Sequence, residues 1–304
     1  VWGASLVIVW SIGLQFVNSK PQLNPLTRVI LGTAGWCGLE ELYSLTDLWW
    51  TSLALTQSPH NLPILHLGQL SGTTTVSAAI VLVNGLIAEA CLTFNLYYRL
   101  KLIQRIWKAS PYLNAAIGSI IILHSIGLML LNRPLSQPIE SSLKIGIIQG
   151  NIGNEVRHYR SGYDLAIENY TKGYISLAEQ GVAAVVTPET AFPYRESQIK
   201  NTSFYQTILN KKVTAFIGGF GEVKGGITNS ILIITGDGKI LSRYDKWKLV
   251  PLGEYIPFEQ YIGKLVDTIS PLEAHAVAGK FAPIIATPIG NIIFGICYDS
   301  AYPE

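Results

Sequence analysis

Three side chains suited to acyl chemistry follow apolar, strand-like segments in the second half of the chain. Glu189 follows VAAVVTP, Lys246 follows ILSRYD, and Cys297 closes NIIFGIC. A thiol becomes a strong nucleophile when a base takes its proton, and Glu189 can serve as that base. A tetrahedral oxyanion needs a positive partner, and Lys246 can supply it. Taken singly, Cys297 is explained as a small buried side chain, and Glu189 and Lys246 as solvated charges at strand ends. The three together predict covalent catalysis by a cysteine.

The segments around these residues predict an α/β domain from residue 143 onward. An apolar stripe from Tyr163 to Leu177, stopped by Gly181, predicts a helix over 163–180. Alternation of buried strands with a helix is typical of layered α/β domains, which gather reactive side chains at the carboxyl ends of strands. The strands are predicted at 143–151, 182–190, 213–219, 227–235, 240–246 and 291–298, with an Asp-Gly turn between the fourth and the fifth.

Three segments resemble the signature segments of the nitrilase, or carbon–nitrogen hydrolase, superfamily. They are TPETAFP, YDKWKLVPLGEYIPF and GICYDSAYPE, in the expected order. The resemblance implies an αββα sandwich with a catalytic triad of Glu189, Lys246 and Cys297. It also implies that Glu254 is the second glutamate, which the superfamily places beside the nucleophile. The resemblance implies no cofactor and no metal.

The first half of the chain has the composition of a membrane region. Charged residues make up 14% of the whole chain, and only 12 of the 42 lie within residues 1–141, against roughly 25% charged residues in ordinary globular proteins. Spanning a bilayer takes about 20 apolar residues. Four stretches approach that length, and the second is the weakest because acidic residues interrupt it. They are residues 1–19, 29–50, 71–88 and 112–132.

The loops between these stretches predict the orientation of the chain. The segment between the third and fourth stretches contains Arg99, Lys101, Arg105 and Lys108 and no acid. By the positive-inside rule this loop is cytoplasmic. The loop at 18–28, with two basic residues, lies on the same side if all four stretches cross. Everything after about residue 133 is then extracytoplasmic.

Two acidic residues, Glu40 and Glu41, fall within the weakest stretch. Carboxylates in hydrocarbon are costly, so both are expected to face a protein interior or a water-filled cavity. The alternative is that the span ends early and both acids lie at the membrane interface. The sequence leaves these two readings open.

The fold predicted for the whole chain is a membrane all-α helical bundle over 1–133, followed by an extracytoplasmic nitrilase-like domain over 143–304. Because the chain lacks an initial Met and stops at Pro303-Glu304, we interpret it as a fragment without either end, so that the sandwich is incomplete at its C-terminus. The net charge of +2, with no basic stripe, argues against a nucleic-acid partner.

A nitrilase domain behind membrane helices resembles the apolipoprotein N-acyltransferase family of bacterial inner membranes. The phrases LVPLGEYIPF, CGLEELYS and LWWTSLALTQS carry this resemblance. It implies transfer of a phospholipid acyl chain, through a cysteine thioester, to the N-terminal diacylglyceryl-cysteine of lipoproteins. Its partners would be a phospholipid donor, a diacylglyceryl-lipoprotein acceptor and the bilayer.

One position departs from that family. Asp299 stands where these acyltransferases often carry Glu, and Asp there is the form of the soluble amidases. Asp299 therefore leaves open a membrane-tethered amidase of the same superfamily. A second alternative, an inactive relative that binds lipid, rests on our interpretation of the chain as a fragment without its C-terminal portion.

Overall fold

The computed structural model describes residues 2–49, 51–134, 142–153, 155–156, 159–256, 276–281 and 284–302. The ends of the two predicted spans at Val1 and Trp50, and the terminal Pro303-Glu304, lie outside these residues. The chain divides into two compact units, residues 1–136 with 301–304, and residues 137–300. Each unit is described by itself.

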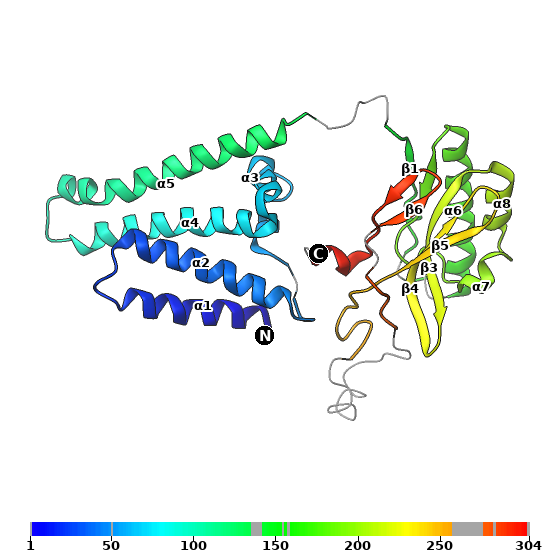
Figure 1. The fold of residues 1–304 in the computed structure, drawn as a ribbon, viewed down its shortest axis with the longest axis horizontal. Coiled ribbons are helices and arrows are strands. Elements are labelled where there is room, and N and C mark those ends of the chain that lie inside the picture. Colours follow the sequence, from blue (N-terminus) through cyan, green and yellow to red (C-terminus); the bar gives the residue numbers. More distant parts are fainter. Residues whose placement is uncertain are drawn as a thin grey trace. The chain divides into compact units, whose positions relative to one another are not determined.

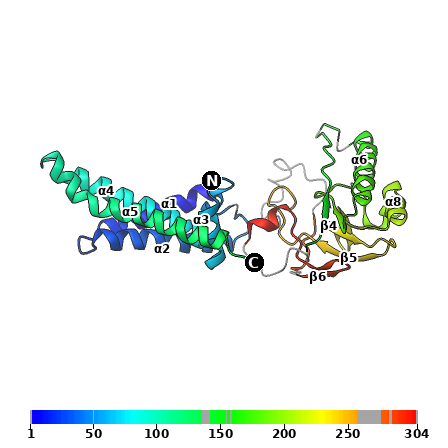
Figure 2. The ribbon, with the colours of Figure 1, turned by 90° about the horizontal axis from the view of Figure 1, so that it is seen from above.

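The first unit is helical. Its long helices are α1 (Trp2–Asn18), α2 (Pro25–Ser44), α4 (Gly68–Leu96) and α5 (Leu102–Leu131), with the short η1 (Leu53–Gln57) and α3 (Leu62–His66) between α2 and α4. Helix α2 begins where Pro25 occupies the first turn and the Asn24 side chain caps it by accepting from Thr27 N at 2.8 Å. Figures 1 and 2 show α1, α2, α4 and α5 side by side within this unit.

Two of these helices, α4 and α5, are long and apolar enough to cross a membrane; α1 is a shorter apolar helix. Each predicted stretch overlaps a helix, but the stretch 29–50 continues beyond the end of α2 at Ser44, and four crossings stay a prediction. The predicted boundaries differ most at α5, which begins at Leu102 and not at residue 112. The basic residues Arg105 and Lys108 therefore lie in its first turns. A hydropathy pattern ends a predicted span at basic residues. Arg and Lys are nevertheless good helix formers, so the helix itself continues through them.

The two acids on α2 have different surroundings. Glu40 is buried, and its carboxylate accepts from Leu53 N at 2.6 Å and from Ser52 Oγ at 3.3 Å. It therefore faces a protein interior, as the first reading expected. Glu41 is exposed on the unit, three residues before α2 ends at Ser44, and its place at the membrane interface stays a prediction.

The second unit is built on a mixed sheet with the order β1-β2-β3-β4-β5. Its strands are β1 (Ile145–Ile147), β2 (Ala184–Val186), β3 (Thr214–Val223), β4 (Gly226–Ile234) and β5 (Ile240–Asp245). Strands β1, β2 and β3 are parallel, and β4 is antiparallel to both β3 and β5. The carboxyl ends of β2, β3 and β5 and the amino end of β4 therefore lie at one edge of the sheet. The hairpin predicted at the Asp-Gly turn is present as β4 and β5.

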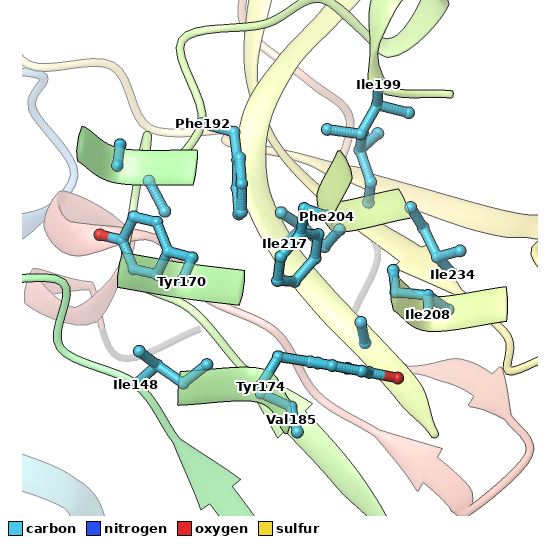
Figure 3. Packing of buried hydrophobic residues seen from close by; sticks show 14 of the residues in the cluster. Ile148, Tyr170, Tyr174, Val185, Phe192, Ile199, Phe204, Ile208, Ile217 and Ile234 are labelled. Carbon is cyan, nitrogen blue, oxygen red and sulfur yellow. The ribbon is translucent and has the colours of Figure 1, made fainter. Parts of the chain in front are cut away.

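One face of this sheet is covered by helices. Helix α6 (Arg160–Glu179) and helix α8 (Ser203–Lys211) pack there, while the short α7 (Glu196–Ile199) lies against β3. Phe192 packs between Tyr170 and Phe204 with tilted rings, at ring-centroid distances of 5.0 and 4.6 Å, and Figure 3 shows these side chains around Ile217. Burying aromatic side chains of this size contributes several kcal/mol to the stability of the layer.

The opposite face of the sheet is covered by a hairpin, β6 (Ile285–Thr287) and β7 (Gly290–Ile292). Ile285, Ile292 and Phe294 pack there against the sheet residues Phe216 and Ile233. The described residues therefore form a helix layer, a sheet and the start of a second sheet, in agreement with a nitrilase-like fold.

The last predicted strand, 291–298, is wrong over most of its length. Regular pairing stops at Ile292, and Cys297 is the first residue of the 3-10 turn η3 (Cys297–Ala301). The run of apolar residues indicated a strand buried on both faces. In the structure, exposed and more buried positions alternate along it, as on a strand with only one covered face.

Candidate active site

The sheet edge described above brings the predicted reactive residues together. Glu189 follows β2, and Lys246 is the residue directly after β5. The backbone of Lys246 extends the β4–β5 ladder, because its N–H donates to Asn229 O at 2.8 Å. Two strands that are not neighbours in the sheet thus supply a carboxylate and an ammonium to one site.

Lys246 lies at the centre of the site. Its side chain is 1% exposed, and Nζ lies 3.2 Å from Glu189 Oε1 and 3.1 and 2.9 Å from the two carboxylate oxygens of Glu254. An ammonium has three N–H donors, and Lys246 uses two of them in hydrogen bonds to Glu189 Oε1 and Glu254 Oε1. One donor therefore remains for a substrate oxygen.

Glu254 is the more strongly held of the two glutamates. Its Oε2 accepts from Val250 N at 2.8 Å and forms an ion pair with Lys246, and its Oε1 accepts from Lys246 and from Asn229 Nδ2. Both oxygens are therefore occupied by donors. This arrangement suits a fixed counter-charge for Lys246 and does not suit a base.

Glu189 is held on one oxygen only. Oε1 accepts from Asn229 Nδ2 at 2.6 Å and from Lys246 Nζ at 3.2 Å. No protein donor to Oε2 is found among the described residues, and about a third of the side chain, 34%, is exposed. Of the two glutamates, Glu189 is thus the one with an oxygen available to take a proton.

Cys297 lies in a turn that Asp299 fixes. Cys297 has a φ of +47°, a left-handed conformation that costs a non-glycine residue about 1–2 kcal/mol. The buried carboxylate of Asp299 accepts from Ile296 N at 2.8 Å, from Tyr244 OH at 2.9 Å and from Lys248 N at 2.9 Å. These bonds tie the turn to β5 and to the segment after it. The Asp299 carboxylate is therefore directed at the scaffold.

The electrostatics of the site keep the thiol neutral. Burial, and then the negative charge of Glu189, raise the pKa of the Cys297 thiol above its ordinary value; Lys246 lowers it by less than these causes raise it. Burial lowers the pKa of Lys246, but its hydrogen bond to Glu254 and the charge of Glu189 outweigh burial, so that the net pKa is raised. Lys246 is therefore a permanent cation.

A cavity of about 250 Å³ lies beside Glu189. Amide and aromatic side chains line it, with Thr190 at its rim, where the backbone also has a positive φ of +48°. The lining includes Gln149, Asn151, Tyr163, Glu189, Thr190 and Phe220. Such a cavity can accept a small polar group next to the carboxylate.

The structure therefore brings together all four residues singled out in the sequence, Glu189, Lys246, Glu254 and Cys297. Sequence reasoning missed Asn229, which bonds both glutamates. A signal was present, because Thr228, Asn229 and Ser230 interrupt the otherwise apolar strand ITNSILII, and Asn is uncommon within strands.

The carbon-nitrogen hydrolase family model matches residues 144–304. Among curated proteins, the chain is similar to an apolipoprotein N-acyltransferase of Nostoc sp., with 46% identity over 100% of this chain and 58% of that protein. It is also similar to an apolipoprotein N-acyltransferase of Synechocystis sp., with 39% identity over 100% of this chain and 59% of that protein. The chain thus spans somewhat under three fifths of the length of these relatives.

Among solved structures, the chain is similar to a carbon-nitrogen hydrolase of Helicobacter pylori G27, at 18% identity and a TM-score of 0.35, over 53% of each chain.

Proposed function

We propose a function from one premise: the chain belongs to the carbon–nitrogen hydrolase family. The function is that of an N-acyltransferase, which moves an acyl chain from a membrane phospholipid, through a thioester on Cys297, to the N-terminal diacylglyceryl-cysteine of a lipoprotein. The names of the relatives from Nostoc and Synechocystis support this substrate class. The observation that carries the chemistry is the ion pair of Glu189 with the buried Lys246, beside a Cys297 thiol whose pKa is raised by burial and by the charge of Glu189.

In the first step, the thiol of Cys297 loses its proton to Glu189 Oε2, and Sγ attacks the carbonyl carbon of the acyl ester. The remaining N–H of Lys246 stabilises the oxyanion that forms. When the ester C–O bond breaks, Glu189 returns the proton to the leaving oxygen. The products are an acyl thioester and a lysophospholipid.

In the second step, the α-amino nitrogen of the acceptor attacks the thioester carbonyl and gives a proton to Glu189. The C–S bond breaks, an amide bond forms, and the Cys297 sulfur leaves and takes the proton back from Glu189. Two successive half-reactions through one covalent intermediate predict ping-pong kinetics.

The helical unit fits this proposal because both substrates are anchored in lipid. Helices α4 and α5 are long and apolar enough to span a bilayer, and the basic residues between them and in the first turns of α5 favour a cytoplasmic connection. The proposal therefore includes a multi-pass protein of the bacterial inner membrane, with its catalytic unit on the extracytoplasmic side.

The alternative of a membrane-tethered amidase had Asp299 as its support. The carboxylate of Asp299 bonds Ile296, Tyr244 and Lys248 and supports the turn. Asp299 would support the turn in the same way whether an amine or water attacks the thioester. No observation therefore favours the amidase over the transferase.

The proposal is tested by intact-protein mass spectrometry of the full-length protein in phospholipid vesicles. The expected result is a mass increase equal to one acyl chain, localised to Cys297, which disappears when a diacylglyceryl lipopeptide is added and reappears on the peptide amine. Cys297→Ser is the matched control and should show neither mass, because a hydroxyl is a much poorer nucleophile than a thiolate. Absence of an acyl mass on Cys297 would favour the amidase, release of free fatty acid in place of acylated peptide would show that water takes the acyl chain from the thioester, and near-normal transfer by Cys297→Ser would remove Cys297 from the mechanism.

A further inference from the structure

The side-chain amide of Asn229 connects the two glutamates of the site. Asn229 lies on β4 and is 7% exposed. Its Nδ2 donates to Glu189 Oε1 at 2.6 Å and to Glu254 Oε1 at 3.1 Å. Both hydrogens of the amide are therefore used to hold carboxylates.

The other end of the same side chain is unsatisfied. Asn229 Oδ1 is buried and has no hydrogen-bond partner among the described residues. An acceptor buried in this way costs about 1–3 kcal/mol. A leucine of similar volume would avoid that cost, so Asn229 is a poor choice for the stability of β4 alone. Buried unsatisfied groups of this kind call for a functional explanation.

We propose that Asn229 is a positioning residue, which holds Glu189 so that Oε2 is directed at the thiol of Cys297. The inference rests on the proposed acyl transfer. A glutamate carboxylate turns easily about its last side-chain bond. Asn229 from β4 and Lys246 from the end of β5 both bind Oε1, and two donors from different directions stop that rotation. Oε2 is then the oxygen that takes and returns the proton.

The same amide keeps the two glutamates in different roles. Glu254 has donors on both oxygens, whereas Glu189 has donors on one. Without Asn229, Lys246 alone would be shared between two partly exposed carboxylates. Glu189 would then be free to turn its available oxygen away from the sulfur.

The test compares Asn229→Leu with Asn229→Asp in the full-length protein, and Asn201→Leu, an exposed asparagine of the same unit, is the matched control. The rate of thioester formation from phospholipid is measured by mass spectrometry, together with the unfolding temperature. Asn229→Leu should form the thioester about 10²-fold more slowly, the loss expected for a displaced catalytic group. The effect should fall on kcat, with KM for phospholipid and the unfolding temperature close to wild type.

A second readout separates positioning from a structural role. The titratable groups bonded to the Asn229 side chain are Glu189 and Glu254, and Lys246 forms ion pairs with both. Asn229→Asp places a third carboxylate against the two glutamates, and like charges disfavour ionisation. The acidic limb of the pH–rate profile should therefore move to higher pH in Asn229→Asp and stay in place in Asn201→Leu.

Wild-type rates in Asn229→Leu would overturn the inference. So would a slow Asn229→Leu variant with an equally lowered unfolding temperature and an unshifted limb in Asn229→Asp, because the residue would then serve the fold alone. If the wild-type protein forms no thioester, the proposed function itself fails, and the inference fails with it.

Discussion

Replacing Lys246 by Met separates the electrostatic role of this residue from that of its neighbour Lys248. The ammonium of Lys246 contacts three carboxylate oxygens at 2.9–3.2 Å. At an effective dielectric of about 20, an ion pair about 4 Å apart is worth about 4 kcal/mol. Methionine fills the space and removes this attraction together with the donor for the oxyanion. Losing one such donor typically slows catalysis about 10²–10³-fold. We expect a loss at the upper end of this range, because the charges of Glu189 and Glu254 are then no longer balanced by Lys246 and repel the oxyanion.

The same change also affects stability, which has to be measured alongside. Breaking a fully buried ion pair costs about 3–5 kcal/mol, but Glu189 and Glu254 are 34% and 19% exposed and regain water. We expect a loss of about 2 kcal/mol in the free energy of unfolding, which is small enough to leave a domain of ordinary stability folded.

The assay follows each half-reaction in a single turnover. Acylation of Cys297 by phospholipid and transfer from the preformed thioester to a lipopeptide are both measured by mass spectrometry. Both should slow in Lys246→Met, because both pass through an oxyanion. In Lys248→Met, which removes an ammonium 4.4 Å above the Trp247 ring and leaves the backbone bond to Asp299, both should stay near wild type. Equal damage by the two changes, or loss in only one half-reaction of Lys246→Met, would refute the assigned role.

Three further outcomes are expected. Glu189→Gln removes a charge that raises the pKa of Cys297, so the rate of iodoacetamide alkylation, followed by mass spectrometry, should rise at lower pH than in wild type; a shift to higher pH would contradict the electrostatics. Burial raises the pKa of Tyr174 to about 12. The stability that its neutral form contributes is therefore complete below pH 10 and is lost as the pH rises through about 12. In urea unfolding curves, Tyr174→Phe should remove this part of the loss of stability at alkaline pH. A cysteine introduced near Lys101 should react with impermeant reagents only from the cytoplasm and one near Ser203 only from outside, and labelling of both from one side would contradict the topology.

The grouping of Glu189, Lys246 and Cys297 could be predicted because it depends on local segments. The carboxyl ends of β2 and β5 meet at one sheet edge whenever the strands between them take the observed directions, and strand-like runs followed by reactive residues indicate those ends. Glu254 could be named from its segment. Glu254 accepts three hydrogen bonds spread over both oxygens, whereas Glu189 accepts on one oxygen. This difference depends on atoms from three separate segments, so the spacing of residues in the sequence cannot show it.

The nucleophile segment could not be predicted from its composition. NIIFGIC is uniformly apolar, and such a run indicates a strand buried on both faces. Whether it pairs depends on a partner that is distant in the sequence. In the structure the carboxylate of Asp299 binds Ile296 N, Tyr244 and Lys248 N, and this three-way contact favours a turn where the pattern favours a strand. Helix α5 differed for a related reason, since Arg105 and Lys108 interrupt a hydropathy pattern but do not interrupt a helix.

The charge of the site indicates when the thiolate forms. Two glutamates and one lysine give the resting site a formal charge of −1, and a thiolate formed by loss of the proton to water would make it −2. Together with burial, this repulsion keeps the pKa of Cys297 high. Transfer of the proton from Cys297 to Glu189 leaves the total at −1, so that route avoids the repulsion. Glu254 cannot take the proton in its place because donors occupy both of its oxygens. We infer that the thiolate is generated only as Sγ attacks the acyl carbonyl, when the new negative charge moves onto the oxyanion beside Lys246.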